Sequence, residues 1–334
     1  MTKKAGGYRV PAIRIWCLVA VCALALGPHP AAADITPTGN VDAVDVVGAT
    51  STPLTASAGD QTFGPEIQIT LDVGQLQVDL STVLTAGTLL EIDAGSVIVT
   101  GAGSQISLIA DRNRLDIQGT ASEIQILNSG VIDATGGTCN LLSCNIYIGN
   151  LAGADVTLVV DGAESELNTI NNFFVADGNT DFGILGADTV ATVDILNGGT
   201  ITSDSVVVSR GLSGGNIQVG QMTDATVNIS GAGSGRDSTS FQVAQGLNAI
   251  AIVNVTSGGI IDTDFFSAAQ DPTAVANISV DGAGSQIQVI DMLIGQSGTA
   301  IRLTHGLRFA FDKVRQHPLV VGDEGQTECK PFVC

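Results

Sequence analysis

Few side chains in this sequence could do acid–base or nucleophilic chemistry. Residues 34–300 contain no histidine, so neither a Ser-His-Asp nor a Cys-His arrangement finds its base there. Asp262 and Asp264 lie two residues apart, and on a strand they would share a face and repel each other. We interpret both as solvated surface residues. The sequence therefore gives no catalytic, cofactor-binding or metal-binding residue.

Four of the six cysteines form two close pairs after the N-terminal region. Cys139 and Cys144 bracket CNLLSC, and Cys329 and Cys334 bracket CKPFVC. In an oxidising compartment Cys139 and Cys144 could close a small disulfide-bonded loop, and two free thiols are the alternative. Zinc is not expected at the first pair, because no histidine lies near it and the second pair is far along the chain.

The strongly acidic composition excludes several classes of partner. The chain has 13 Lys+Arg against 33 Asp+Glu, for a net charge of −20. Such a surface repels phosphate backbones and anionic lipids, so we expect no nucleic-acid partner. Carboxylates could bind calcium weakly, but the sequence has neither a GGxGxD repeat nor an EF-hand loop. We expect no cofactor.

The first 33 residues have the order of a secretory signal peptide. Four basic residues precede an apolar run over residues 15–27, and the small residues Ala31 and Ala33 precede Asp34. We expect cleavage between Ala33 and Asp34. The apolar run is shorter than the ~20 residues that cross a bilayer, although an uncleaved anchor is the alternative. No later segment predicts a spanning helix, so we expect a periplasmic, secreted or outer-membrane surface location.

Two short turn motifs alternate along residues 61–300. One places D/T/S-G-A between alternating apolar runs, and its alanines are 61, 69 and 51 residues apart. The other places a small glycine-containing turn before a β-branched run, as in residues 126–133, 195–202 and 255–262. Both motifs belong to one long cycle, which contains strand–turn units of about 20 residues.

These repeats predict an all-β chain folded as a right-handed parallel β-helix, or solenoid. A unit of about 20 residues cannot bury its apolar face alone, so successive units stack and align their Val, Ile and Leu in parallel strands. Asn-Gly and Asp-Gly dipeptides leave a minority of antiparallel pairing open. We divide the chain into a signal peptide at 1–33, an N-terminal segment or cap at 34–60, repeats at 61–300 and an atypical tail at 301–334.

VDGAGS and NGGTIT segments, repeated in an acidic and lysine-poor exported chain, resemble the passenger domains of bacterial autotransporters, the type V secretion family. In that family a signal peptide, a right-handed β-helical passenger and a C-terminal outer-membrane β-barrel lie in one polypeptide. The resemblance covers residues 60–300. It implies a structural or adhesive surface rod whose protein or glycan ligand is unknown, and it implies no catalytic residue.

The chain departs from that family pattern at residues 301–334. This tail holds five of the nine Lys+Arg that follow residue 33, and it is too short for the many ~10-residue strands of a barrel. We expect either a reading frame lost near residue 300, which would give a non-functional truncated passenger, or a genuine C-terminal cap. An uncapped strand edge at this end predicts self-association.

Carbohydrate-active β-helix enzymes are the alternative class. Asn179-Thr180-Asp181 resembles the NTD motif of polygalacturonases, and His305-Gly306 resembles their HG. The adjacent aspartate pair and the basic motif of that family are absent, and glycosidic chemistry needs paired carboxylates that flank one bond. We therefore expect a non-enzymatic passenger, with a polysaccharide lyase or glycosidase as the alternative.

Overall fold

The computed structural model describes residues 35–45, 47–111, 113–137, 145–151, 153–177, 189–210, 223–245 and 248–294, together with the short strands 302–304 and 313–315. Its strands form one 26-stranded sheet, and every pairing among β3 to β26 is parallel. The predicted fold class, an all-β parallel solenoid, is confirmed. No helix that could span a membrane occurs among these residues.

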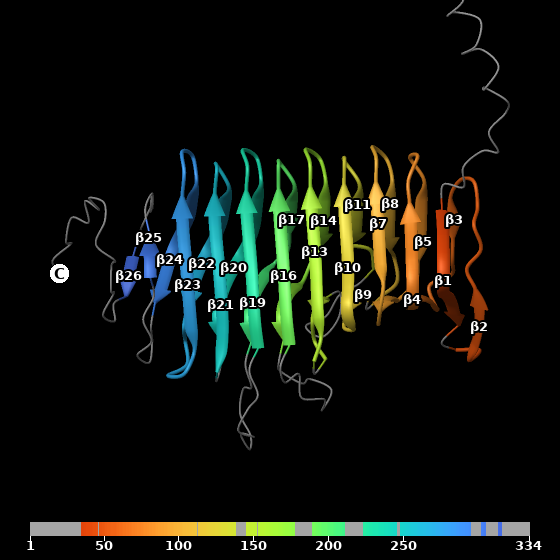
Figure 1. Ribbon diagram of the computed structural model, residues 1–334, viewed down its shortest axis with the longest axis horizontal. Coiled ribbons are helices and arrows are strands. Elements are labelled where there is room, and N and C mark those ends of the chain that lie inside the picture. The colour runs from red at the N-terminus through yellow and green to blue at the C-terminus, as the bar shows by residue number, and fades with distance from the viewer. Residues whose placement is uncertain are drawn as a thin grey trace, which may run out of the picture. The chain divides into compact units, whose positions relative to one another are not determined.

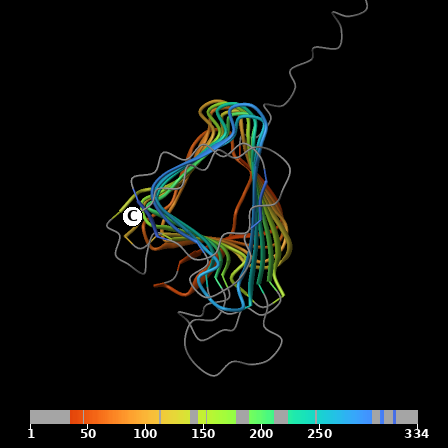
Figure 2. The same cartoon turned by 90° about the vertical axis from the view of Figure 1, so that its left-hand side faces the viewer.

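Each coil of the solenoid passes through three flat faces (Figure 2). Face 1 contains the second half of β4 (Ile67–Val78), β7 (Ser96–Thr100), β10 (Thr120–Leu127), β13 (Asp155–Asp161), β16 (Thr189–Leu196), β19 (Thr223–Ser230), β21 (Ala249–Thr256), β23 (Val275–Asp281) and β25 (Arg302–Thr304). Face 2 contains β3 (Gln61–Thr62), β5 (Val83–Ala86), β8 (Gln105–Leu108), β11 (Val131–Ala134), β14 (Glu166–Thr169), β17 (Thr200–Thr202) and the first halves of β20 (Gly235–Gln245), β22 (Ile260–Ala268) and β24 (Gln286–Ile294). Face 3 contains the first half of β4, β6 (Leu89–Ile92), β9 (Arg114–Ile117), β12 (Asn145–Ile148), β15 (Asn172–Asp177), β18 (Ser205–Arg210), the second halves of β20, β22 and β24, and β26 (Lys313–Arg315).

The coil is right-handed. In Figure 1 the face 1 strands from β10 to β23 lie toward the viewer and point up, while the face 2 strands return behind them. The chain advances from right to left as it winds, which defines a right-handed screw.

The two turn motifs occupy the same corner, between faces 1 and 2. Turns at this corner begin at residues 101, 128, 162, 197, 231, 257 and 282, so consecutive turns are 27, 34, 35, 34, 26 and 25 residues apart. The expected long cycle is therefore two coils, one with a Gly-Ala turn and the next with a turn of the Asn-Gly-Gly kind. The expected unit of about 20 residues was too short, because a coil with three faces and their turns takes 25–35 residues.

A serine in each Gly-Ala turn ties that turn to the preceding coil. The Ser234 hydroxyl donates to the carbonyl of Ser230 (2.7 Å) and accepts the backbone N–H of Gly198 (2.9 Å). Ser165 and Ser285 make the same pair of bonds. Their hydroxyls donate to the carbonyls of Asp161 and Asp281. They accept the backbone N–H groups of Ser129 and Gly258 in the preceding turns. These serines are buried, so each bond is shielded from water.

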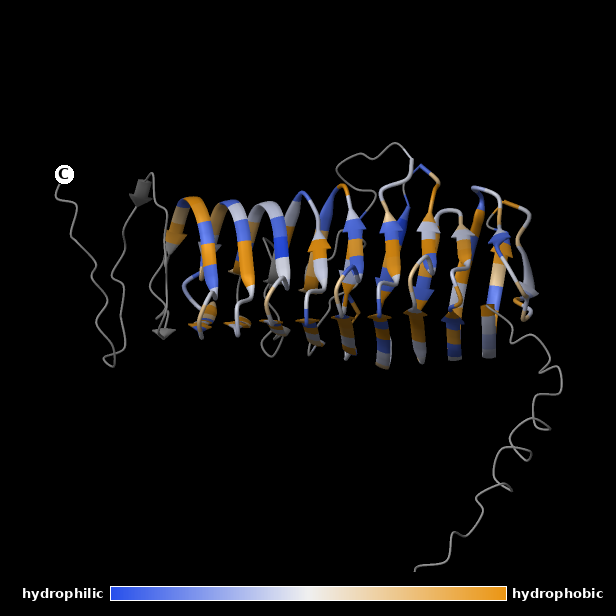
Figure 3. Ribbon diagram, turned by 90° about the horizontal axis from the view of Figure 1, so that it is seen from above, coloured by the Kyte–Doolittle hydropathy of each residue, from blue (hydrophilic) through white to orange (hydrophobic). Residues whose placement is uncertain are grey.

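Alternation along each strand builds the core. Within β16, inward residues such as Val193 and Ile195 are fully buried, while Thr192 and Asp194 between them face outward. Parallel register places like residues above one another, so that Val193 lies between Leu158 and Val227. Figure 3 shows this alternation as apolar and polar bands along the strands.

The N-terminal end differs from the stacked coils. β1 (Ile35–Asp45) pairs antiparallel with β4 along its whole length and with β2 (Thr50–Pro53). Antiparallel pairing among the described residues therefore lies here and not at the Asn-Gly or Asp-Gly turns. At the other end β25 and β26, both within the tail at 301–334, pair parallel with β23 and β24.

Candidate functional site

The outward positions of face 3 bring acidic, basic and aromatic side chains together across successive coils. Glu91, Asp116, Tyr147 and Phe174 occupy one column in four successive coils, because β6, β9, β12 and β15 pair in register. Arg114 lies two residues before Asp116, so both side chains point outward from the same strand. We call these five residues the face 3 cluster.

Arg114 joins the acidic and aromatic parts of the face 3 cluster. Its Nε donates to Asp116 Oδ1 at 2.6 Å, and its guanidinium carbon lies 4.5 Å from the centre of the Tyr147 ring. Tyr147 stacks on Phe174, with ring centroids 5.0 Å apart and planes 20° from parallel. Both rings are only 5% exposed despite their outward positions, so they are covered and do not form an open platform.

Asparagines fix the orientation of the tyrosine. Asn145 Nδ2 donates to the Tyr147 hydroxyl (3.0 Å), and Asn145 Oδ1 accepts both the backbone N–H and the side-chain amide of Asn172 (3.2 Å each). A buried tyrosine hydroxyl needs such a partner, and this network supplies it.

The two carboxyl groups of the face 3 cluster hold protons unusually well. Burial raises the pKa of Asp116 to about 7 despite the opposing effect of Arg114, and the nearby carboxylates of Glu91 and Asp93 add to the increase. The pKa of Glu91 is also raised, first by burial and then by the charge of Asp93. Gln118 opposes this rise by donating a hydrogen bond to Glu91, and it donates a second one to Asp93. A carboxyl group that stays protonated near neutral pH can donate a hydrogen bond or act as a general acid.

The predicted surface aspartates behave as expected. Asp262 and Asp264 both lie on the outward side of β22 and are exposed. Register places Asp237 beside Asp262 on the neighbouring coil, which adds a further negative charge to this part of face 2. These carboxylates lie further along the solenoid than the face 3 cluster, five strands or more beyond β15 by chain order.

The remaining residues singled out from the sequence lie outside the described residues. They are Ala33, Asp34, Cys139, Cys144, Asn179, Thr180, Asp181, His305 and Gly306. The signal-peptide cleavage, the disulfide and the polygalacturonase-like motifs therefore stay predictions.

A ladder of amides and a carboxylate runs along face 1. Asn254 Nδ2 donates to Asn228 Oδ1 (2.8 Å), and Asn228 Nδ2 donates to Asp194 Oδ1 (2.7 Å). Register aligns these residues on β16, β19 and β21. Such stacking stiffens the outer surface of the rod, as ladders of identical amides do in other stacked sheets.

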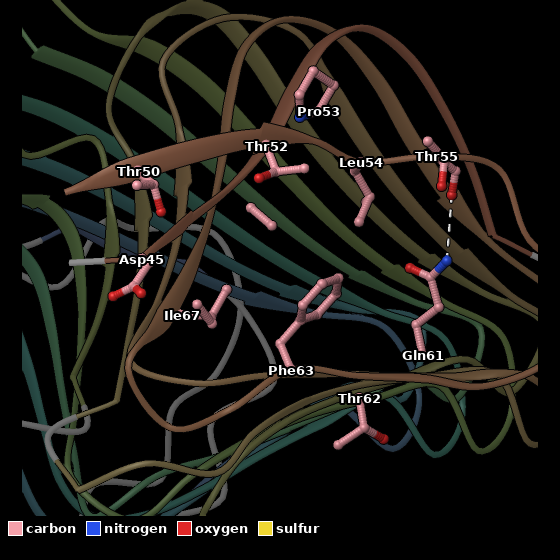
Figure 4. Close-up of a pocket in the computed structure, with 11 residues that line it drawn as sticks. Asp45, Thr50, Thr52, Pro53, Leu54, Thr55, Gln61, Thr62, Phe63 and Ile67 are labelled. Atoms are coloured by element: carbon pink, nitrogen blue, oxygen red, sulfur yellow. Dashed lines mark hydrogen bonds between the residues drawn. The ribbon is translucent and has the colours of Figure 1, made fainter. Parts of the chain in front are cut away.

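A cavity of about 500 Å³ lies at the N-terminal end, between the β1–β2 pair and the start of the first coil (Figure 4). Leu54, Phe63 and Ile67 supply its apolar walls, and Gln61 Nε2 donates to the Thr55 carbonyl (3.3 Å) across one side. Its one carboxylate belongs to Asp45, which accepts the N–H groups of residues 47 and 48 at the adjacent turn. We interpret the cavity as the junction between the cap and the coil.

Among the residues that the structure describes, no cluster of three or more His, Cys, Asp or Glu side chains could hold a metal ion.

Comparison with protein-family models, with curated proteins and with solved structures found no match to this chain. The solenoid and its surfaces are therefore the features from which function is inferred.

Proposed function

We propose that the chain is an exported, surface-displayed rod of the autotransporter-passenger type, with a structural and adhesive role. The observation that carries this proposal is the uninterrupted parallel stack from β4 to β24, in which every coil is bonded to the next on three faces. A stack of this kind is stiff along its axis, and its outward columns repeat at the ~4.8 Å strand spacing. Extended repetitive surfaces suit weak contacts repeated many times with a protein or glycan.

The acidic, polar surface supports display outside the cell. Half-buried outward ladders such as Asp194–Asn228–Asn254 give the rod a polar surface, and the net charge of −20 opposes non-specific association. The signal-like order of residues 1–33 supports export on independent grounds.

Cell fractionation and adhesion assays test this proposal. Cells that produce the full chain should release or display a product whose N-terminus is Asp34, identified by mass spectrometry. Beads coated with that product should bind cell-surface proteins or glycans above the level of beads coated with serum albumin. A product retained in the cytoplasm, or beads that bind no more than the albumin control, would contradict the proposal.

A carbohydrate-active enzyme is the second candidate, and one observation favours it. Glu91 and Asp116 are neighbouring carboxyl groups with raised pKa values, one property required of a general acid. Against this role, Asp116 is 4% exposed and bonded to Arg114, so a sugar could reach it only after the cluster moved. Incubation of the purified chain with acidic and neutral polysaccharides, followed by measurement of new reducing ends or unsaturated products, separates the enzyme from the rod.

A further inference from the structure

The interior of the solenoid contains an arginine in a column of aliphatic residues. In the inward column of face 2, register places Arg236 between Ile201 and Ile261. Its side chain is buried, with 2% of the residue exposed. A cation at this position is costly, because the surrounding aliphatic side chains cannot replace the water that it loses.

The described residues give Arg236 no ion pair, although the Asp237 carboxylate acts on it as a nearby charge. Its Nη1 donates to the carbonyls of Ile201 and Asp237, its Nη2 donates to Ser203 Oγ, and its guanidinium carbon lies 5.3 Å from the centre of the Phe173 ring. Its Nε–H has no acceptor among the residues described. The carboxylate of Asp237 points outward from the wall, because that residue is exposed. Carbonyls and a ring orient the guanidinium, but none of them carries a negative charge.

A strip of buried hydroxyl groups lies beside this arginine. The inward column next to it carries Thr169, Ser203, Ser238 and Thr263, whereas neighbouring coils carry the apolar Ala134 and Val289 at the matching positions. Ser238 lies two residues after Arg236 on one strand, so both side chains point inward on the same side. Its hydroxyl has a single, long hydrogen bond to Thr263 Oγ1 (3.4 Å), which leaves it able to turn toward a better acceptor.

We propose that Arg236 and Ser238 form a binding site for a small monovalent anion of the halide class inside the solenoid. The guanidinium supplies the compensating charge, and the Arg236 Nε–H and the Ser238 hydroxyl supply two donors. Ile201 and Ile261 flank Arg236 on the coils above and below, and their aliphatic side chains disfavour strongly hydrated anions such as sulfate. Burial lowers the pKa of Arg236 to about 9, so the group still carries its charge at neutral pH.

Equilibrium unfolding in different sodium salts tests the site. The full chain is unfolded in urea at neutral pH, with chloride exchanged for gluconate at constant sodium concentration and constant ionic strength. An anion that binds only the folded state lowers the unfolding constant tenfold for each tenfold rise in its concentration above the dissociation constant. We expect this dependence for chloride and bromide, and anomalous scattering from bromide-soaked crystals should place the ion beside Arg236.

Single substitutions test whether the chloride dependence of stability arises at Arg236 and Ser238. Arg236→Met should remove the dependence on chloride, and Ser238→Val should remove it while keeping the arginine. Arg114→Met, which removes an arginine from face 3, should keep it. Equal stability of the unmodified chain in chloride and gluconate would overturn the proposal, because water alone would then satisfy Arg236. Retention of the chloride effect in Ser238→Val would overturn it even if Arg236→Met does not fold.

Discussion

Asp116 shows how a single environment can set the protonation of a residue in this solenoid. Its pKa is about 7 in the folded chain because the carboxyl group is buried, whereas an aspartate in an unfolded chain has a pKa of ~3.9. Between these two values the folded state binds more protons than the unfolded state. The stabilising contribution of Asp116 is therefore complete below about pH 4 and is lost as the pH rises through about 7.

Replacement of Asp116 by Asn should flatten the dependence of stability on pH. At ~1.4 kcal/mol per pKa unit, we expect the wild type to lose about 2–4 kcal/mol more than Asp116→Asn between pH 4 and pH 8. Urea unfolding at several pH values measures the difference. Asp262→Asn, at an exposed position on face 2, is the matched control and should keep the wild-type slope. An unchanged slope in Asp116→Asn would show that another group carries the titration.

The face 3 cluster could not be predicted from the sequence, and the reason is geometric. Glu91, Asp116, Tyr147 and Phe174 stack on one another, yet they are 25, 31 and 27 residues apart along the chain. Loops of different length separate the strands, so no fixed spacing marks the column. The exposure of Asp262 and Asp264, by contrast, followed from alternation within one strand and was predicted correctly.

The corner between faces 1 and 2 decides how successive elements stack. Removal of the Ser234 hydroxyl would leave the partly buried N–H of Gly198 and the carbonyl of Ser230 each without one bond. A buried polar group left unpaired costs about 1–3 kcal/mol. We therefore predict that Ser234→Ala lowers the free energy of unfolding by that amount, measured by urea denaturation. Ser230→Ala, four residues earlier and partly exposed, should change it by less than ~0.5 kcal/mol.

The last glycine of the Asn-Gly-Gly turn is required by the neighbouring coil. A Cβ on Gly199 would lie 2.3 Å from the carbonyl oxygen of Val160, a backbone atom that cannot move without breaking the stack. Gly199→Ala should thus destabilise the chain by more than the ~1 kcal/mol typical of a single substitution, as measured by thermal unfolding. Gly64→Ala, where a Cβ meets nothing within 4 Å, is the control and should be nearly neutral. Equal effects in both variants would contradict the close approach.

The sequence patterns predicted the two kinds of turn, but they did not predict that both occupy one corner of the coil in alternation. Both motifs could be recognised because Gly and Asn supply the left-handed backbone that each turn needs, as at Asn197 (φ 50°) and Gly198 (φ 96°). That the Gly-Ala and Asn-Gly-Gly turns share one corner in alternate coils depends on hydrogen bonds between coils, such as Ser234 to Gly198. Contacts between coils leave no mark on the local pattern, so the coil was predicted as a shorter unit of about 20 residues.

At the scale of the whole solenoid, the antiparallel β1–β4 pairing protects the N-terminal edge. An open strand edge presents unpaired N–H and C=O groups to other chains, and β1 covers that of β4 along its length. Ile35 and Val41 hold β1 in place, since both are buried in the core under the cap. The cap was not foreseen as a strand, because its sequence, ITPTGNVDAVD, carries proline, glycine and only weak alternation.

Loss of this cap should make the chain associate through the exposed edge of β4. The double variant Ile35→Asp and Val41→Asp places two charges in the core under β1, which should detach the strand and expose the edge of β4. We expect the apparent mass of the double variant in sedimentation velocity to rise with protein concentration. The apparent mass of the wild type should rise less, because its β4 edge is covered. Val47→Asp adds the same charge at a residue that is 74% exposed, and it should sediment like the wild type. If the double variant stayed folded and sedimented identically to Val47→Asp at every concentration, edge protection by β1 would be ruled out. Any self-association of the unmodified chain would then have to arise elsewhere, as at the C-terminal end of the stack, where β25 and β26 extend β23 and β24.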